Sequence, residues 1–217
     1  MEKFSIILKV VKRYVRMEKI IWGEVSMYYP KMVGEKCYLS VINPEDYERY
    51  TSWVNDMEVA VGVGMAHKLI TASAEKEILE RLSTSEYNFA ILDKETDQVI
   101  GNVGFNKFDL INQCAEVGIF IGNKAYWSNG YGREALSLLL DFGFNILNLY
   151  NIRLGVFGFN QAAISCYQKL GFKEAGRIRG ARKIAGTRYD LIYMDMVAGE
   201  YESIYVEKII KQKEQLR

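Results

Sequence analysis

Residues 119–135 read IFIGNKAYWSNGYGREA: an apolar run, a loop containing Gly130 and Gly132, and the beginning of a helix. The apolar run favours a strand, and apolar residues at three- and four-residue steps from Tyr131 to Leu149 predict a long helix. The first turn of a helix carries backbone N–H groups without intrahelical partners, and glycines let a ligand approach them closely. The stretch therefore predicts a binding site for a phosphate-bearing ligand where the strand passes into the helix.

Two common nucleotide-binding motifs fit this loop poorly. A P-loop ends in Gly-Lys-Ser/Thr, which the stretch does not contain. A dinucleotide fingerprint needs a third glycine where Ala135 stands and an acidic residue about 20 residues later, whereas Asp141 falls inside the helix. For two glycines alone, a tight turn without any ligand is the alternative interpretation, so the surrounding sequence has to decide.

The chain before this stretch alternates between short helices and strands. The predicted elements are a strand at 37–41, a helix from 43–44 to about 55, a loop over 59–71, a helix over 73–82, and strands at 88–92, 98–105 and 115–121. Polar turns separate the last three strands. This pattern predicts that they pair in series as antiparallel neighbours.

After the long helix, an extended stretch over 151–157 completes a strand–helix–strand unit, which is typical of a parallel pair. A helix over 161–170 ends at Gly171, and two strands follow at 173–179 and 189–197. We expect an α/β fold: a mixed, mostly antiparallel sheet of six or seven strands with a central parallel pair and helices on both faces.

A second segment, NQAAISCYQKLGF at residues 160–172, follows the glycine loop and its helix. Together with YWSNGYGREA at 126–135, it resembles the acyl-coenzyme A signature of the GNAT acyltransferase superfamily. The resemblance covers residues 33–198, and within the superfamily it is strongest to the branch of ribosomal-protein alanine N-acetyltransferases and spermidine N-acetyltransferases. One position departs from the family pattern: Trp127 stands three residues before the first glycine, where Gln or Arg is common.

The resemblance implies acetyl-CoA as cosubstrate and no metal. The residues that it implies for binding acetyl-CoA are Ile119, Phe120, Ile121, Ser128, Asn129, Gly130, Tyr131, Gly132, Arg133, Asn160 and Tyr167. In the family, a bulged strand separates from its neighbour and leaves backbone N–H groups for the pantetheine arm and the thioester oxygen. The resemblance implies that the loop of Ser128 to Arg133 holds the pyrophosphate, that Asn160 bonds the pantetheine arm, and that Tyr167 protonates the departing thiolate.

Several of these side chains have alternative interpretations. Asn160 is also a typical helix N-cap, and Tyr167 on a short amphipathic helix is also a typical core residue. Glu116, on the strand before the expected bulge, is the candidate general base, or a solvent-facing acid of the sheet. Cys166 is not expected to be a nucleophile because no neighbouring histidine activates it, and His67 is expected in an exposed loop.

The expected function is direct acetyl transfer from acetyl-CoA to a primary amine, which is a peptide N-terminus, a polyamine or another small amine. A noncatalytic acyl-CoA-binding regulatory module is one alternative, and a membrane-surface protein acting through its N-terminal segment is another. Five acidic side chains could attract a polyamine, or simply belong to an exposed helix: Glu45, Asp46, Glu48, Asp56 and Glu58.

Composition excludes other classes of function. The chain of 217 residues has 28 basic and 27 acidic residues, so it shows no overall charge suited to nucleic acid. Cys37, Cys114 and Cys166 are widely spaced and accompanied by a single histidine, which predicts neither a disulfide framework nor a zinc site. No apolar run is long enough to span a membrane, and we expect a cytoplasmic protein.

We expect a catalytic domain over residues 32–198 between two additions, an amphipathic helical extension at 1–31 and a helical tail at 199–217. Apolar residues recur on one face over 3–26, and residues 1–31 carry seven basic against three acidic side chains. Such a face packs on its own domain, on a second subunit or on a membrane. We hypothesise a subunit contact, that is, a homodimer.

Overall fold

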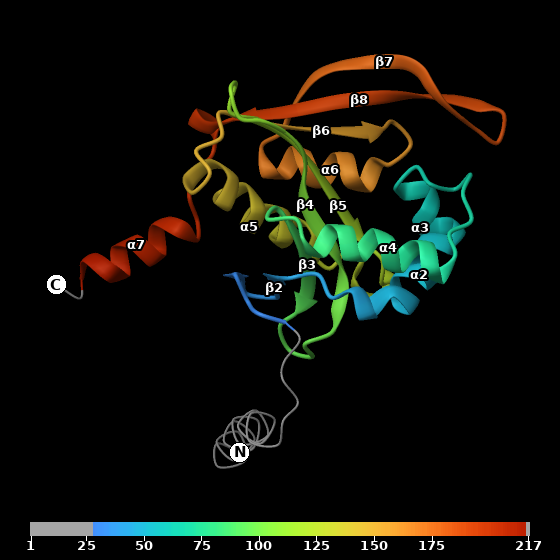
Figure 1. The fold of residues 1–217 in the computed structure, drawn as a ribbon. Helices are drawn as coiled ribbons and strands as arrows, with labels where there is room; N and C mark the ends of the chain where they lie inside the picture. The colour runs from blue at the N-terminus through green and yellow to red at the C-terminus, as the bar shows by residue number, and fades with distance from the viewer. Residues whose placement is uncertain (1–27, 216–217) are drawn as a thin grey trace, which may run out of the picture.

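The expected strands join into one mixed sheet in the computed structural model, which describes residues 28–215 (Figure 1). The strand order is β1-β2-β3-β4-β5-β6-β8-β7, and all neighbours are antiparallel except the parallel pair β5 and β6. The strands are β1 (Met32–Val33), β2 (Cys37–Ser40), β3 (Asn88–Asp93), β4 (Val99–Asp109), β5 (Cys114–Ile121), β6 (Asn151–Phe157), β7 (Lys173–Ile184) and β8 (Thr187–Val197). The expected fold class is confirmed. The described residues form eight strands, whereas six or seven were expected. The strand that was not expected is β1, whose two residues are too few to show an apolar alternation in the sequence.

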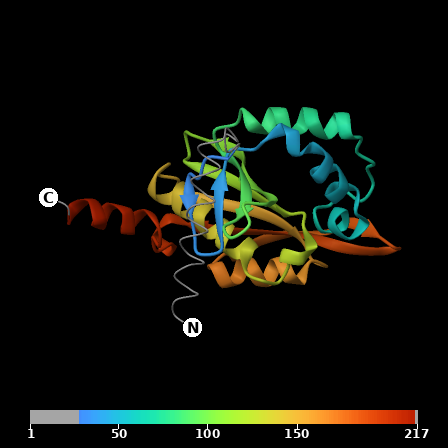
Figure 2. The same ribbon diagram turned by 90° about the horizontal axis from the view of Figure 1, so that it is seen from below.

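Helices cover both faces of the sheet. One face carries α2 (Tyr47–Asn55) and α4 (Ala72–Ser83), and the other carries α5 (Tyr131–Asn145) and α6 (Gln161–Leu170) (Figure 2). The remaining helical elements are α3 (Met57–Gly62), α7 (Val206–Glu214) and the 3-10 turns η1 (Pro44–Asp46), η2 (Lys124–Tyr126) and η3 (Ala198–Glu200). Each face buries its own apolar core, with Leu136 and Leu139 of α5 in the larger one and Leu79 of α4 in the smaller one. No helix among residues 28–215 is long and apolar enough to cross a membrane.

Polar side chains cap two of the helical elements. The Asn43 side chain accepts a hydrogen bond from the Glu45 N–H (3.1 Å) at η1, and Thr71 Oγ1 accepts one from the Ala74 N–H (3.2 Å) at α4. Gly171, with a φ of 102°, ends α6. The amphipathic helix expected over residues 3–26 lies outside the described residues.

The loop expected over residues 59–71 is wrong in its first part, where α3 forms. Asp56 begins this helix, and its Oδ1 accepts the N–H of Glu58 (2.9 Å) and of Val59 (3.4 Å). Gly62 is the last residue of the helix. The glycines of this segment therefore end a short helix instead of keeping the whole segment irregular.

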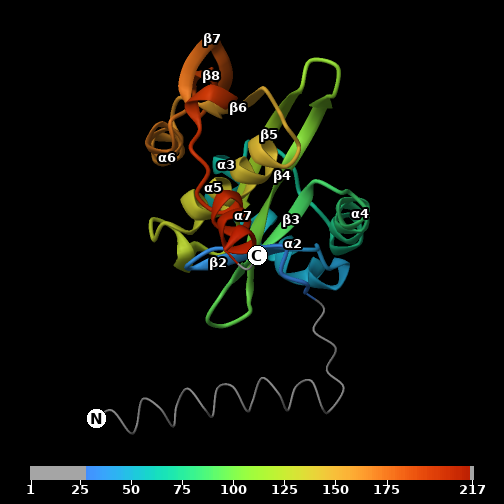
Figure 3. The same cartoon turned by 90° about the vertical axis from the view of Figure 1, so that its left-hand side faces the viewer.

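The sheet divides between β5 and β6. Their parallel pairing covers only Cys114–Glu116 against Asn151–Arg153, so from Val117 onward β5 pairs with β4 alone. At the same level β4 carries one extra residue, Asn106, since Phe105 pairs with Val117 and Lys107 with Glu116. A bulge bends its strand and increases the local twist, and beyond it β6, β7 and β8 run across the direction of β4 and β5 (Figures 1 and 3). A bulge was expected in the 115–121 strand, but the extra residue stands in the neighbouring strand.

A buried carboxylate ties the C-terminal segment to α5. Asp141 is 1% exposed and accepts hydrogen bonds from Ser203 Oγ (2.8 Å) and from the backbone N–H groups of Ile204 (2.9 Å), Tyr205 (2.5 Å) and Val206 (3.2 Å). These N–H groups lie at the beginning of α7, where a helix has no internal acceptors for them. Asp141 therefore fixes the place from which α7 extends away from the sheet (Figure 1).

We predict that Asp141→Asn lowers the free energy of unfolding by about 1.5–3 kcal/mol, the range for hydrogen bonds to a charged group. Asparagine keeps the shape but replaces one acceptor oxygen by a donor that faces N–H groups. Urea denaturation measures the loss. Glu207→Gln, which removes an exposed ion pair with Lys211 (2.7 Å) within α7, is the control and should change little. Equal effects of the two substitutions would contradict the anchoring role of Asp141.

Candidate active site

The free edge of β5 presents backbone groups to the opening beside β6. In an antiparallel pair, residues alternate between directing both backbone groups to the neighbour and directing both away. The Gly122 N–H bonds to the Ile100 carbonyl (2.9 Å), so Ile121 and Ile119 direct their backbone groups away from β4. Accordingly, the Ile121 carbonyl accepts a hydrogen bond from Trp127 Nε1 (2.8 Å). The N–H groups of Ile119 and Ile121 face the opening, as a thioester-binding edge requires.

Phe120 differs from its two neighbours. The same alternation directs its backbone groups to β4, and its ring packs with Tyr50 (6.2 Å between ring centroids) and Trp53 (6.1 Å) on the face covered by α2. The structure therefore places the Phe120 side chain away from the opening between β5 and β6.

The loop after β5 has the geometry of an anion-binding turn. Ser128 (φ 59°) and Gly130 (φ 87°) both adopt left-handed backbone conformations, and Gly130 is the N-cap of α5. The N–H groups of Tyr131, Gly132 and Arg133 have no hydrogen-bond acceptor among residues 28–215. Three free donors at the positive end of a helix dipole form a site for phosphate oxygens.

Lys36 adds a positive charge to this loop. Its Nζ donates a hydrogen bond to the carbonyl of Asn129 (3.2 Å) and lies 5.8 Å from the centre of the Tyr131 ring. The lysine comes from the turn between β1 and β2, far from the loop in sequence. No local sequence pattern predicts a contact between residues so far apart in the chain, and the sequence analysis missed it.

Asp93 at the end of β3 holds the loop after β5 in place through two tyrosines. Its buried carboxylate accepts hydrogen bonds from Thr96 Oγ1 (2.6 Å), the Tyr131 hydroxyl (3.0 Å) and the Tyr126 hydroxyl (3.3 Å). Burial acts to raise the pKa of Asp93, but the hydrogen bonds from Thr96 and Tyr131 outweigh it and hold the pKa below its ordinary value. Burial and the bond to Asp93 in turn raise the pKa of Tyr131 to about 12.

Glu134, in the first turn of α5, fixes the same loop to the first strands. Its carboxylate accepts the backbone N–H groups of Glu35 (2.7 Å), Lys36 (2.8 Å) and Cys37 (2.9 Å). Burial acts to raise its pKa, and these backbone hydrogen bonds outweigh that effect and lower it. The turn that carries Lys36 is thereby held against the loop.

The two residues expected on α6 occupy different environments. Asn160 caps the helix, with Oδ1 accepting the Ala163 N–H (3.2 Å) and Nδ2 donating to the Gly62 carbonyl of α3 (3.4 Å). The Tyr167 hydroxyl has no hydrogen-bond partner within the described part of the chain, while its ring packs against the larger core and Phe172. Burial and then the neighbouring Cys166 raise the pKa of Tyr167 to about 12, so the phenol keeps its proton at neutral pH.

Glu116, the expected base, is paired, and the two side chains not expected to act in catalysis, Cys166 and His67, lie in other environments. Both carboxylate oxygens of Glu116 accept hydrogen bonds from Lys107 Nζ (2.9 and 3.1 Å). Burial raises the pKa of the Cys166 thiol, which is the opposite of what a nucleophilic cysteine needs. His67 Nδ1 lies 3.2 Å from a guanidinium nitrogen of Arg182 on β7.

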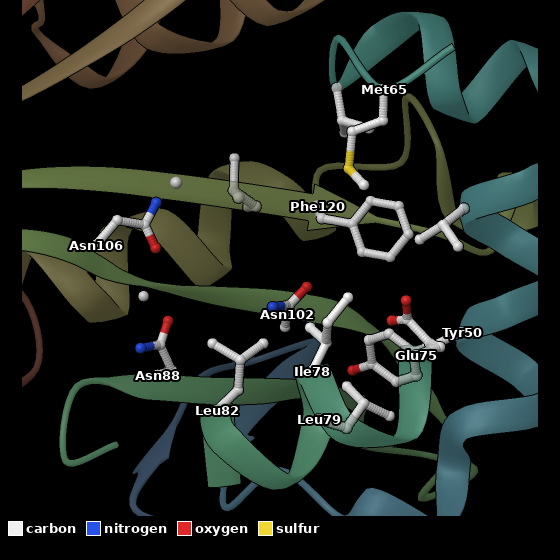
Figure 4. Close-up of a pocket in the computed structure, with 15 residues that line it drawn as sticks. Tyr50, Met65, Glu75, Ile78, Leu79, Leu82, Asn88, Asn102, Asn106 and Phe120 are labelled. Atoms are coloured by element: carbon white, nitrogen blue, oxygen red, sulfur yellow. The ribbon is translucent and has the colours of Figure 1, made fainter. Parts of the chain in front are cut away.

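A cavity of about 240 Å³ lies between the helices α2 and α4 and the face of β3, β4 and β5 (Figure 4). Its lining is largely apolar, with the side chains of Asn88, Asn102, Asn106 and Glu75 as exceptions. Because Ile119 also lines it, the cavity reaches the β5 edge. The sequence analysis missed Glu75, although a signal existed: the acid stands on the apolar stripe of its helix.

The acids considered for attracting a polyamine do not line this cavity. Glu45 pairs with Lys76 (2.8 Å), whereas Asp56 (2.7 Å) and Glu58 (3.0 Å) both pair with Lys124. The lining residues include neither these acids nor the two nearby ones, Asp46 and Glu48.

Comparison with known proteins identifies the family. Residues 37–173 match the family model described as an acetyltransferase (GNAT) domain, and the chain belongs to this family. An uncharacterized N-acetyltransferase p20 from Bacillus licheniformis is 37% identical over 113 residues, which cover 52% of this chain and 63% of that protein, less than two thirds of its length. A spermidine N(1)-acetyltransferase from Vibrio cholerae is 30% identical over 117 residues, 54% of this chain and 66% of that protein.

A solved structure supports the fold. The spermidine N-acetyltransferase from Vibrio cholerae in complex with CoA and spermine has a TM-score of 0.68 and 22% identity, covering 77% of this chain and 99% of that chain. At this identity the likeness shows a shared fold, which is the one expected from the two sequence motifs.

We predict a pH-dependent contribution of Asp93 to stability. Because its folded-state pKa lies below the unfolded value of about 3.9, the contribution is present above roughly pH 4 and is lost as the pH falls through the folded pKa. Asp93→Asn should therefore lower the unfolding free energy at pH 7 and lower it less at pH 3. Urea denaturation at both pH values measures the difference, with Glu95→Gln, exposed in the same turn, as control. A difference that does not depend on pH would contradict this role of the charge.

Proposed function

We propose that the protein transfers an acetyl group from acetyl-CoA directly to a primary amine. The observation that carries this proposal is the β5 edge, where the N–H groups of Ile119 and Ile121 face an opening beside the free N–H groups of α5. A linear ligand with a pyrophosphate at one end and amide and thioester carbonyls along its arm matches this order of donors.

The residues present suit acetyl-CoA. The loop from Ser128 to Arg133, with Lys36 beside it, would hold the pyrophosphate, and the N–H groups of Ile119 and Ile121 would hold the arm and the thioester oxygen. When bound, acetyl-CoA supplies an acetyl group activated as a thioester. The Asn160 amide already bonds Ala163 and Gly62, so any contact with the arm adds to its capping role.

Tyr167 is the proposed general acid. The amine nitrogen forms a bond to the acetyl carbon while the carbon–sulfur bond breaks, and the leaving thiolate takes the phenol proton. The proton that the nitrogen loses after attack returns to the phenolate. A phenol whose pKa is raised to about 12 is fully protonated when the reaction needs it.

The comparisons support an amine as acceptor, since both the relative and the solved structure from Vibrio cholerae are named as spermidine acetyltransferases. A noncatalytic acyl-CoA-binding module remains a second candidate. The Tyr167 hydroxyl favours catalysis over it, because no group of the described residues engages this hydroxyl and it is not sealed from solvent, which leaves its proton available to a ligand. The membrane-surface hypothesis rests on residues outside 28–215.

We predict that Gly130→Val lowers CoA affinity at least tenfold. A β-branched side chain is strained at a φ of 87°, and the loop would have to move away from the geometry that aligns its N–H groups. Gly186→Val is the matched control: its φ is 82°, nothing lies within 4 Å of its added Cβ, and it stands in the turn between β7 and β8. Calorimetry with CoA measures both variants, and equal affinities would refute the loop as the binding site.

We predict that Tyr167→Phe retains CoA binding but lowers turnover by roughly 10²- to 10⁴-fold, the usual contribution of a general acid. Thiol release from acetyl-CoA, screened against amino sugars, amino-acid amides, short peptides and polyamines, measures turnover. Cys166→Ala is the neighbouring control and should keep its activity, because transfer is direct. Full activity of Tyr167→Phe would show that this ring only packs, and loss of activity in Cys166→Ala would favour a covalent intermediate.

A further inference from the structure

Glu75 is a buried carboxylate that the proposed mechanism has not used. Its residue is 4% exposed, and its carboxylate has neither a hydrogen bond nor an ion pair with any residue of the described range 28–215. Figure 4 shows the two oxygens directed into the cavity, between Tyr50 and Phe120. No side-chain oxygen among the described residues is both sealed from solvent and unpaired, so the two Glu75 oxygens are accessible from the cavity, and a ligand that enters the cavity meets them directly.

The rest of the lining contains no second charge. Apart from Glu75 and the Tyr50 phenol, whose hydroxyl donates to the Gly101 carbonyl (3.0 Å), no titratable side chain lines the cavity as the described residues form it. The polar groups that remain are the amides of Asn88, Asn102 and Asn106. The lining therefore offers one negative charge and several neutral hydrogen-bonding groups.

Two of these amides occupy spaces that glycines leave for them. A Cβ atom on Gly104 would lie 2.2 Å from Asn88 Oδ1, and one on Gly118 would lie 2.5 Å from Asn106 Nδ2. In addition, Asn88 Nδ2 donates to Ser85 Oγ (2.8 Å). The amides thus lie close against the sheet in a preformed row along β3 and β4, which is the arrangement expected of groups that orient a ligand.

We propose that Glu75 binds the acceptor's ammonium group and takes its proton, a role that rests on the proposed acetyltransferase function. We further propose that this cavity selects an amine with a single positive charge and neutral hydroxyl or amide groups over a polyamine. The single carboxylate pairs with one ammonium, and the asparagine row bonds the neutral groups. A second ammonium in the same cavity would find no carboxylate.

The position of Glu75 suits the transfer. The cavity reaches the β5 edge at Ile119, so an amine held by Glu75 lies in the space that opens on the thioester site. The ammonium gives one proton to the carboxylate, which passes it to water, and the freed lone pair forms the bond to the acetyl carbon. Burial raises the pKa of Glu75, which makes it a stronger base than an exposed glutamate.

The test compares kcat/KM of the full chain for four amines: glucosamine and serinamide, each with one ammonium, and putrescine and spermidine, with two and three. We expect the wild type to prefer the first pair at least tenfold. Faster acetylation of spermidine overturns this inference and leaves the proposed function intact. Absence of turnover with every amine, together with intact CoA binding, overturns the proposed function and this inference with it.

Substitutions assign the preference to Glu75. Glu75→Gln should lower kcat/KM for the preferred amine at least 100-fold with CoA affinity unchanged, whereas Glu77→Gln, exposed on the same helix, should not. If Glu116→Gln abolishes turnover and Glu75→Gln does not, Glu116 is the base and the inference is wrong.

Asn102→Asp adds a second carboxylate to the lining and should shift the preference toward putrescine by at least tenfold. An unchanged preference in this folded, active variant would show that the charge of the lining does not select the acceptor.

Discussion

The separation of β5 from β6 after Glu116 is the constraint on which the rest of the molecule depends. The extra residue Asn106 in β4 lies opposite the point where pairing between β5 and β6 ends, so the bend of one strand coincides with the loss of the other neighbour. From there the N–H groups of Ile119 and Ile121 have no strand to bond. A strand edge in the middle of a sheet would invite pairing with another chain, but here the helices α5 and α6 cover one face beside it. The backbone is thus left free only where a ligand can take the place of a strand.

Two carboxylates keep the phosphate loop ready for its ligand. Asp93 holds the loop through the hydroxyls of Tyr126 and Tyr131, and Glu134 holds the turn of Lys36 through three backbone N–H groups. In both carboxylates hydrogen bonds to the charged form outweigh burial and lower the pKa, so the charges stay ionised at neutral pH. The donors of these hydrogen bonds are neutral, so the two negative charges remain. The attraction for phosphate comes from the free N–H groups at the start of α5 and from Lys36, which the two carboxylates hold in place.

Local patterns in the sequence predict most of the fold and only part of the site. Strands, helix caps and the glycine loop depend on neighbouring residues, and they agree with the structure except at α3, which forms where a loop was expected. The place of the bulge, the contact of Lys36 with Asn129 and the ion pair of Glu116 with Lys107 depend on how distant segments meet, which no period or spacing reveals. Glu75 is intermediate, because a charge on an apolar helical stripe is visible in the sequence, whereas the cavity that it faces is not.

The site has a donor half, proposed to bind acetyl-CoA, and an acceptor half, the cavity proposed to bind the amine. The two halves use different groups to recognise a ligand, which explains why the family signature covers the donor half and not the acceptor half. The donor half is built from backbone N–H groups, so its sequence signal is the glycine and helix pattern that makes such groups accessible. The acceptor half is lined mainly by residues of α2, α4, β3, β4 and β5, none of which belongs to the two motifs at 126–135 and 160–172. Its charge and shape can change without altering the fold or the donor site. The identity of the acceptor therefore has to be derived from the side chains that line the cavity, and among those in the described residues Glu75 is the one carboxylate.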